Sequence, residues 1–159
     1  MKNSFCVIGL ILLSSTAYSQ ETNSNSIAKE AIQETIQSFF DAIEKQDTIL
    51  FKSTLKPRGQ VWVQNRTKDP VQITTRFLNE DVGHLKGNHQ YQEKALHYDI
   101  KVHKGIAMAW VAYEFWRDGK FSHCGIDAFT LMKIERQWKI VSLSYSVETS
   151  GCEELSTPK

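Results

Sequence analysis

The chain has 159 residues, with 19 basic and 18 acidic side chains and a formal net charge of +1. Proteins that bind nucleic acids usually carry a basic excess or a basic stripe, because contacts to phosphate supply much of their affinity. The near-balanced charge argues against that class, and the length suffices for one domain with a hydrophobic core but not for two.

The N-terminus has the order of features that a signal peptidase recognises. A short start with one lysine, Met1–Asn3, precedes an uncharged apolar run, Phe5–Leu13, and small residues follow in Ala17–Ser19. A membrane anchor would need about 20 apolar residues to cross the bilayer, and this run is roughly half as long. We therefore expect cleavage after Ser19, export to the periplasm or the extracellular space, and no membrane anchor in the mature chain.

This prediction divides the chain into a signal peptide, 1–19, a flexible segment, 20–25, and a single domain, 26–159. Cleavage removes Lys2 and no acidic residue, so 19 − 1 = 18 basic residues balance 18 acidic ones in the mature chain. Cys124 and Cys152 remain. In an oxidising compartment they would form either a disulfide or two separate thiols, and the residues alone leave both open.

The first half of the domain has the pattern of helices around one short strand. Apolar residues recur at spacings of three and four across Ser26–Lys45, which predicts an amphipathic helix. Asp47 is a suitable N-cap for a second, short helix over Thr48–Leu55. Gln60–Gln64 alternates like a strand, and the apolar residues of Ile73–Leu85 suggest a third helix.

The second half has the pattern of an antiparallel sheet. Leu96–Val102 alternates between apolar and polar residues, and further strands are expected over Ile106–Trp116, Phe121–Ile134 and Trp138–Val147. The turns between them are short, and Asp118-Gly119 is a strong hairpin signal. Helices followed by a meander of strands predict an α+β fold with the helices packed on one face of a curved sheet.

Two segments resemble a known family: FFDAIEKQD near the start and WRDGKFSHCGIDAFTLMKIERQWKIVSL near the end. They are similar to the nuclear-transport-factor-2-like (SnoaL-like) superfamily, and most of all to its small proteins described as putative lumazine-binding. The resemblance implies a cone-shaped, strongly bent antiparallel sheet packed on three N-terminal helices, with a pocket at one end and usually a dimer. Members include isomerases, dehydratases and binding domains, so the fold does not determine the function.

The hairpin at Asp118-Gly119 brings candidate catalytic residues together. If these two residues form the whole loop, Glu114 lies opposite His123 and Trp110 lies opposite Asp127, all on one face of the sheet together with Trp116. A carboxylate beside an imidazole suits general acid–base catalysis, and indole rings around small residues suit a flat ligand.

The same face can also be the outer face of the sheet. The turn at Lys104-Gly105 places Ile100 opposite Ala109 and Asp99 opposite Trp110, which makes the side of Tyr113 the helix-covered one. A β-bulge would shift the register by one residue and exchange the two faces beyond it. The sequence leaves pocket and outer face open.

The candidate sites follow from these patterns. The catalytic candidates are His123, Asp127, Glu114 and Tyr113, and the candidates for a ligand pocket are Trp110, Trp116 and Phe129. His97, Asp99 and His103 share a strand face, but alternating polar residues are more often the solvated side of a strand than a metal site. We expect neither a metal nor another cofactor.

The resemblance also implies a disulfide, because similar proteins pair a cysteine of a His-Cys-Gly segment with a Gly-Cys near the end. Here the pair is Cys124 with Cys152. The last hairpin places Cys124 opposite Val147, and a straight strand would carry Cys152 about 16 Å past its partner. Ser150-Gly151 could turn the chain back and close the bond.

Three functions are compatible with these features. We favour a non-catalytic protein that binds a small apolar or aromatic molecule in its pocket. One alternative is an isomerase or dehydratase that uses Asp127 or His123 as the base. The other is a module whose sheet face forms a homodimer or binds a partner.

Overall fold

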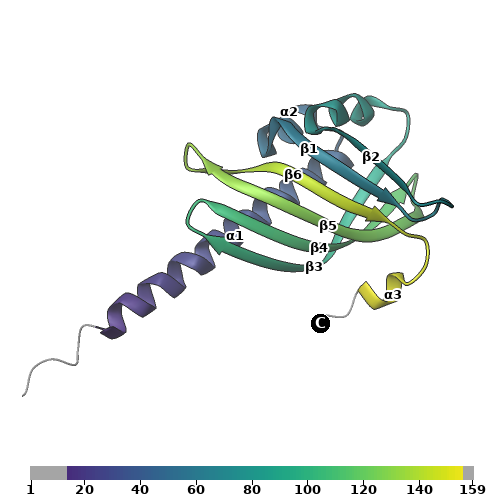
Figure 1. Ribbon diagram of the computed structural model, residues 1–159. Helices are drawn as coiled ribbons and strands as arrows, with labels where there is room; N and C mark the ends of the chain where they lie inside the picture. Colours follow the sequence, from purple (N-terminus) through teal and green to yellow (C-terminus); the bar gives the residue numbers. More distant parts are fainter. Residues whose placement is uncertain (1–13, 156–159) are drawn as a thin grey trace, which may run out of the picture.

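The computed structural model describes residues 14–155, which form one curved sheet and the helices packed against it (Figure 1). In chain order the elements are α1 (Ser14–Glu44), α2 (Thr48–Thr54), β1 (Leu55–Asn65), β2 (Gln72–Phe77), the 3₁₀ helix η1 (Leu78–Lys86), β3 (Tyr91–His103), β4 (Ile106–Arg117), β5 (Lys120–Ile134), β6 (Gln137–Val147) and α3 (Cys152–Leu155). Most of the predicted signal peptide, residues 1–13, lies outside the described range.

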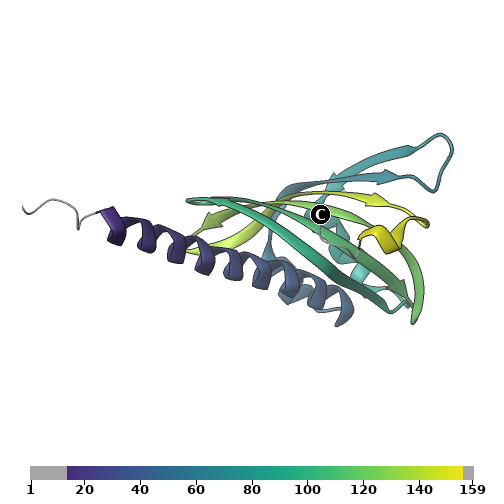
Figure 2. The same ribbon diagram turned by 90° about the horizontal axis from the view of Figure 1, so that it is seen from below.

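The strand order in the sheet is β2-β1-β6-β5-β4-β3. The pairs are antiparallel except for β1 and β6, which run parallel, so the sheet is mixed and not purely antiparallel. The predicted α+β class and the bent sheet packed on N-terminal helices are confirmed. Figure 2 shows α1 lying along one face of the curved sheet and continuing beyond its edge.

Helix α1 supplies much of the core that faces the sheet. Its side chains Ile32, Ile36, Phe39 and Phe40 are almost completely buried, in agreement with the apolar spacing. The helix extends beyond the expected start at Ser26 and includes the segment 20–25, for which a flexible chain is predicted. No glycine or proline interrupts this stretch, so it contains neither of the two strongest helix breakers. Within residues 14–155, no helix is long and apolar enough to cross a membrane.

The predicted start of the second helix is confirmed. The carboxylate of Asp47 accepts hydrogen bonds from the backbone N–H groups of Ile49 and Leu50, each at 2.9 Å, and so caps α2. The cap places Phe51 against Phe39, with ring centroids 4.9 Å apart. Aromatic rings from two helices therefore meet over the sheet.

The prediction of a third helix over Ile73–Leu85 is only partly right. Residues up to Phe77 form the edge strand β2, which pairs with β1, and a 3₁₀ helix follows. The strand contains the β-branched run Ile73-Thr74-Thr75, which favours extended backbone. Apolar spacing over so short a segment does not distinguish the two structures.

Bulges in β3, β5 and β6 change which side chains face the helices. In β3, Leu96 is an extra residue, because Ala95 pairs with Tyr113 while His97 pairs with Ala112. In β5, Ser122 is an extra residue in the same way. In β6, Val141 is an extra residue, because Ile140 pairs with Leu131 while Ser142 pairs with Thr130. Beyond each bulge the alternation is reversed, so side chains that a straight strand would expose point towards the helices.

The disulfide implied by the resemblance is present. Cys124 and Cys152 are bonded, with their Cα atoms 5.8 Å apart. Cys124 bridges Glu148 and not Val147, and the chain then turns at Gly151, whose φ of 77° is readily adopted only by glycine. The bond holds α3 against the outer face of the sheet and closes a loop for which chain entropy suggests a stabilisation of about 3–4 kcal/mol.

Candidate functional site

A cavity of about 300 Å³ lies between the inner face of the sheet and the helices. Its walls are mainly aromatic and aliphatic, and its polar groups come from six elements. The apolar lining residues are Phe39, Ile43, Phe51, Leu85, Tyr91, Phe115 and Leu143, and the polar ones are Arg76, Asp81, His84, Glu93, Tyr113, His123, Asp127 and Tyr145. Mostly apolar walls with a few polar groups are typical of small-molecule sites.

Two carboxyl groups meet in this cavity. Asp127 on β5 is only 1% exposed, and its Oδ2 atom has no hydrogen-bond donor among the described residues. Glu93 on β3 lies deep in the protein but keeps part of its surface open to the cavity. Because both groups are acceptors when ionised, they can hydrogen-bond to one another only if one of them carries a proton.

The electrostatics favour that shared proton. Burial raises the pKa of Glu93 to about 7, although the hydrogen bond with Asp127 opposes the rise. Burial and the neighbouring carboxyl of Glu93 raise the pKa of Asp127 well above its usual range. Like charges so close together in a desolvated site cannot both persist at low cost. At neutral pH the pair therefore holds a proton that two exposed carboxylates would have lost.

His123 reaches the cavity from the same strand as Asp127. Its ring stacks on Phe115, with centroids 4.8 Å apart, and its Nδ1 atom lies 3.0 Å from the hydroxyl oxygen of Ser122. Burial lowers the pKa of His123. The imidazole is therefore neutral at physiological pH and can accept or donate a hydrogen bond but carries no charge to offer a ligand.

Tyr113 contributes its ring to the cavity but not its hydroxyl group. The hydroxyl donates to the backbone carbonyl of Ser146 at 2.6 Å. There the backbones of β5 and β6 approach so closely that a Cβ atom on Gly125 would lie 2.1 Å from that same carbonyl oxygen. Burial raises the pKa of Tyr113 further above its ordinary value, so the hydroxyl keeps its proton.

Arg76 is the basic residue that lines the cavity, and it is already paired. Its guanidinium bonds to the carboxylate of Asp81 at 2.5 and 3.2 Å and donates to the hydroxyl of Tyr145 at 3.1 Å. The Tyr145 oxygen accepts this bond, so its own proton remains available to a ligand. Burial raises the pKa of Tyr145, which keeps that proton in place.

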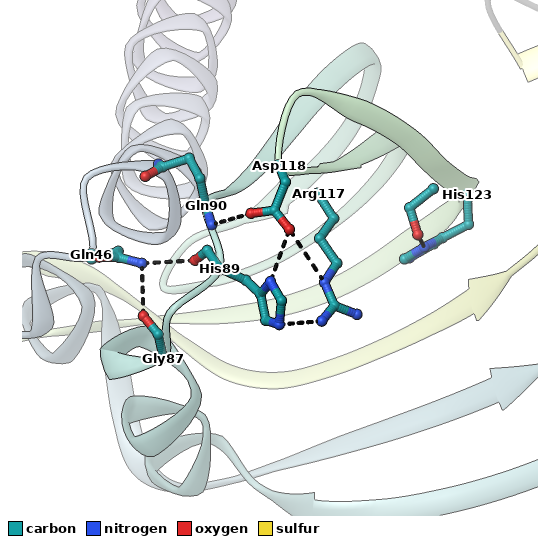
Figure 3. A network of polar contacts seen from close by, with 8 residues as sticks. Gln46, Gly87, His89, Gln90, Arg117, Asp118 and His123 are labelled. Carbon is teal, nitrogen blue, oxygen red and sulfur yellow. Dashed lines mark hydrogen bonds and ion pairs between the residues drawn. The ribbon is translucent and has the colours of Figure 1, made fainter.

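A polar network fixes the loop between Leu85 and Tyr91, both of which line the cavity (Figure 3). The carboxylate of Asp118, in the β4–β5 turn, accepts from the backbone N–H of Gln90 at 2.9 Å and lies 2.8 Å from Nδ1 of His89. From the α1–α2 turn, Gln46 donates to the carbonyl of His89 at 2.8 Å. The network joins three turns of the chain and holds this wall of the cavity.

The structure separates the residues that the sequence predicted to lie together. The expected pairing of Glu114 with His123 is wrong, because the bulge at Ser122 places Phe115 opposite His123 and Cys124 opposite Glu114. His123 and Asp127 consequently face the cavity with Tyr113. Glu114 stays on the outer face, where its carboxylate accepts a hydrogen bond from the indole of Trp116 at 3.3 Å.

The other predicted residues lie outside the cavity. Trp110 is on the outer face and 57% exposed, and Trp116 is on the same face beneath the ammonium group of Lys94. Phe129 is buried in the core against Phe39 and Phe40. His97, Asp99 and His103 belong to the exposed side of β3, and residues 14–155 contain no group of three potential metal ligands.

Sequence reasoning missed Glu93, Arg76 and Tyr145. Simple alternation along β3 would place Glu93 on the solvent side, and the bulge at Leu96 turns it inwards. Arg76 was assigned to a helix. Such bulges leave only a weak signal in the sequence. The signal here is the run Glu93–Leu96, in which polar and apolar residues do not alternate cleanly.

Comparisons with known proteins agree with the fold. A family model described as putative lumazine-binding matches residues 27–146. No curated protein is significantly similar to the sequence.

Several solved structures share the architecture at low identity. A protein from Novosphingobium aromaticivorans described as NTF2-like with a cystatin-like fold is 14% identical, with a TM-score of 0.65 over 94% of this chain and 100% of that chain. A putative dehydratase of the NTF2-like family from Streptomyces avermitilis is 13% identical, with a TM-score of 0.65 over 79% and 99%. The β subunit of a putative aromatic-ring-hydroxylating dioxygenase, also from N. aromaticivorans, is 14% identical, with a TM-score of 0.66 over 79% and 92%.

The carboxyl pair predicts an unusual pH dependence of stability. Because the folded-state pKa values are raised, the folded protein binds more protons than the unfolded chain between about pH 4 and pH 7. The free energy of unfolding should therefore fall as pH rises through this window, by roughly 2–3 kcal/mol from the pair. Asp127→Asn should remove most of this loss, since an amide can donate to Glu93. Denaturant unfolding at pH 5 and pH 8 measures the difference.

The matched control is Glu114→Gln on the outer face, which should keep the wild-type profile. His123 has the opposite effect, because its lowered pKa costs stability as pH falls, and it is present in all three proteins. Parallel profiles for the wild type and Asp127→Asn would contradict a shared proton.

Proposed function

Since this chain belongs to the putative lumazine-binding family of the NTF2-like superfamily, we propose that it binds a small, flat, largely apolar molecule in the cavity between helices and sheet. The observation that carries the proposal is the Oδ2 atom of Asp127, which has no hydrogen-bond partner among residues 14–155 and lies beside Glu93 within aromatic walls. A buried polar atom without a partner costs free energy, and a ligand that supplies the partner recovers it. The family description names lumazine, a flat two-ring heterocycle, which agrees with such a ligand.

The walls suit a flat ring. Tyr91 and Phe115 lie with ring centroids 5.6 Å apart on one side of the cavity, and Phe39 and Phe51 come from the helices on the other. Aromatic side chains bind rings through stacked or edge-to-face contacts, each of which adds to the free energy of apolar burial. The volume of about 300 Å³ is at the small end of ligand pockets, which limits the ligand to one or two rings.

A second candidate is an enzyme of the isomerase or dehydratase type. Its specific support is that the cavity holds His123 and Asp127, whose pKa values are displaced in opposite directions, together with Glu93. A carboxylate with a raised pKa can remove a proton from carbon beside a carbonyl group. Tyr145, polarised by Arg76, could donate to the developing oxyanion, whereas the hydroxyl of Tyr113 is already engaged.

The outer face of the sheet supports a homodimer. Trp62, Ser144, Ala128 and Trp110 form one row across four neighbouring strands, so two exposed indoles flank a floor of small side chains. Met108, on the same face as Trp110, is 61% exposed. Apolar surface of this kind on a sheet commonly marks a contact with another protein, and a second copy of the chain is the partner we propose.

The ligand can be identified by native mass spectrometry. The protein is expressed as residues 1–159, with the predicted signal peptide, in a bacterial host that exports it. We expect the chain to have lost residues 1–19 and to carry a non-covalent adduct of roughly 150–300 Da, in keeping with the cavity volume. Phe115→Ala should weaken the adduct at least tenfold, because Phe115 forms a wall. Trp116→Ala, one residue away on the outer face, is the matched control and should retain it.

Two results would count against pocket binding: an adduct that both variants keep equally, or no adduct together with no affinity for any one- or two-ring compound. Returning the identified ligand to the protein in D₂O separates binding from catalysis. Gain of deuterium at carbon with the wild type but not with Asp127→Asn would favour the enzyme.

The dimer is tested by light scattering of the mature protein at micromolar concentration. We expect twice the chain mass for the wild type and the single-chain mass for Trp110→Glu, because a charge in an apolar interface is costly to desolvate. Ile49→Glu is the control, since Ile49 is 82% exposed on α2, away from the sheet face. A monomeric wild type would refute the proposed dimer.

A further inference from the structure

The charges around the cavity disfavour an anionic ligand. The lining contains the carboxyl groups of Asp81, Glu93 and Asp127, and no lysine. Its one guanidinium, on Arg76, is neutralised by Asp81. His123 is neutral at physiological pH for the reason given above. A carboxylate or phosphate would therefore lose its hydration without gaining a lysine or an unpaired guanidinium, and it would be repelled by the carboxyl pair.

The hydrogen-bonding groups of the cavity also favour a ligand that is not an anion. The Tyr113 hydroxyl is occupied by the carbonyl of Ser146, and the Arg76 guanidinium is occupied by Asp81 and Tyr145. What is missing within the described residues is a donor for Asp127 Oδ2. Glu93 can supply a single proton to the pair, which leaves the remaining carboxyl oxygens as acceptors. A ligand that complements this site must bring N–H donors.

A planar pair of N–H groups meets that requirement best. Two parallel N–H groups on one N–C–N unit match the two oxygens of a carboxylate and form the bidentate contact that arginine makes in proteins. If the unit is cationic, the aromatic rings that line the cavity add a cation–π attraction, which strengthens when the site is desolvated. The flat shape of such a unit also suits the aromatic walls.

We propose that the ligand of this cavity presents an amidine-type edge, either an amidinium group or an amino group beside a protonated ring nitrogen, to the carboxyl groups of Glu93 and Asp127. The inference rests on the proposed function, because it names the chemical class of the molecule bound at that site. It separates heterocycles with a donor pair from neutral rings without one and from ring-bearing acids.

A cationic edge makes binding depend on pH. The amidinium replaces the shared proton of the carboxyl pair, so binding releases that proton and strengthens as the pair ionises. The other charged or titratable groups around the pair are Asp81 and His84 from η1, Arg76 from β2, Tyr91 and Tyr98 from β3, Tyr113 from β4, His123 from β5 and Tyr145 from β6. Burial raises the pKa of Tyr98, Tyr113 and Tyr145, so none of these three tyrosines ionises near neutrality.

Three fragments of one shape test the inference on the wild-type protein: benzamidine, benzamide and benzoate, which are cationic, neutral and anionic at pH 7. Ligand-observed NMR titrations at pH 6 and pH 8 measure their affinities. We expect benzamidine to bind at least tenfold more tightly than benzamide, benzoate to show no binding, and the affinity for benzamidine to rise at least threefold from pH 6 to pH 8. Glu93→Gln should reduce the affinity for benzamidine to that for benzamide, while Glu114→Gln should leave both affinities unchanged.

The outcomes distinguish this inference from pocket binding itself. Equal affinity for all three fragments, with loss of binding in Phe115→Ala, would leave a ring-binding cavity and overturn the amidine-type edge. Tighter binding of benzoate would overturn it as well. If benzamidine fails to bind while another one- or two-ring compound binds, the amidine-type edge is also overturned. Size would not explain that failure, because benzamidine is smaller than the cavity.

Discussion

Two carboxyl groups buried side by side cannot both be ionised at neutral pH without a large cost, and the candidate site depends on this constraint. Glu93 and Asp127 satisfy it by sharing a proton, which makes the pair an acceptor-rich surface with one mobile hydrogen. The aromatic walls intensify the effect because they keep water away from the pair. The carboxyl pair lowers the free energy of unfolding at high pH. The same pair enables the cavity to bind a ligand with N–H donors or to transfer a proton.

The fold brings the two carboxyl groups together through irregularities in the strands. Glu93 faces inwards because Leu96 is bulged. Asp127 faces inwards in regular alternation with the buried Phe129 and Leu131, and the bulge at Ser122 joins this register to the short turn at Asp118-Gly119. Each bulge reverses the alternation of inward and outward side chains along its strand. Residues on both sides of a bulge can therefore contribute side chains to the helix-covered face. The disulfide from Cys124, next to His123, then ties the end of the chain to the outer side of this wall.

Much of the architecture could be predicted from local patterns, whereas the site could not. The spacing of Ile32, Ile36 and Phe39 and the cap at Asp47 each follow from interactions within a few residues, and they predict α2 and the part of α1 that packs on the sheet. The pairing of Ile100 with Ala109 follows from a regular two-residue turn and is confirmed. Whether Glu93 and His123 point into the cavity, as counted from the neighbouring turns, depends on single extra residues in β3 and β5. The free energy of such a bulge depends on the curvature of the whole sheet, which no local sequence pattern reveals.

The most direct test of this account is a pH titration of the side-chain carboxyl carbons by ¹³C NMR, in wild-type protein without ligand. The account predicts that the Glu93 signal titrates with a midpoint near pH 7 and that the Asp127 signal also titrates well above its usual range, while Asp118 titrates below its ordinary value. Separate midpoints near pH 4 for both Glu93 and Asp127, as for exposed carboxylates, would contradict the shared proton and with it the proposed chemistry of the cavity.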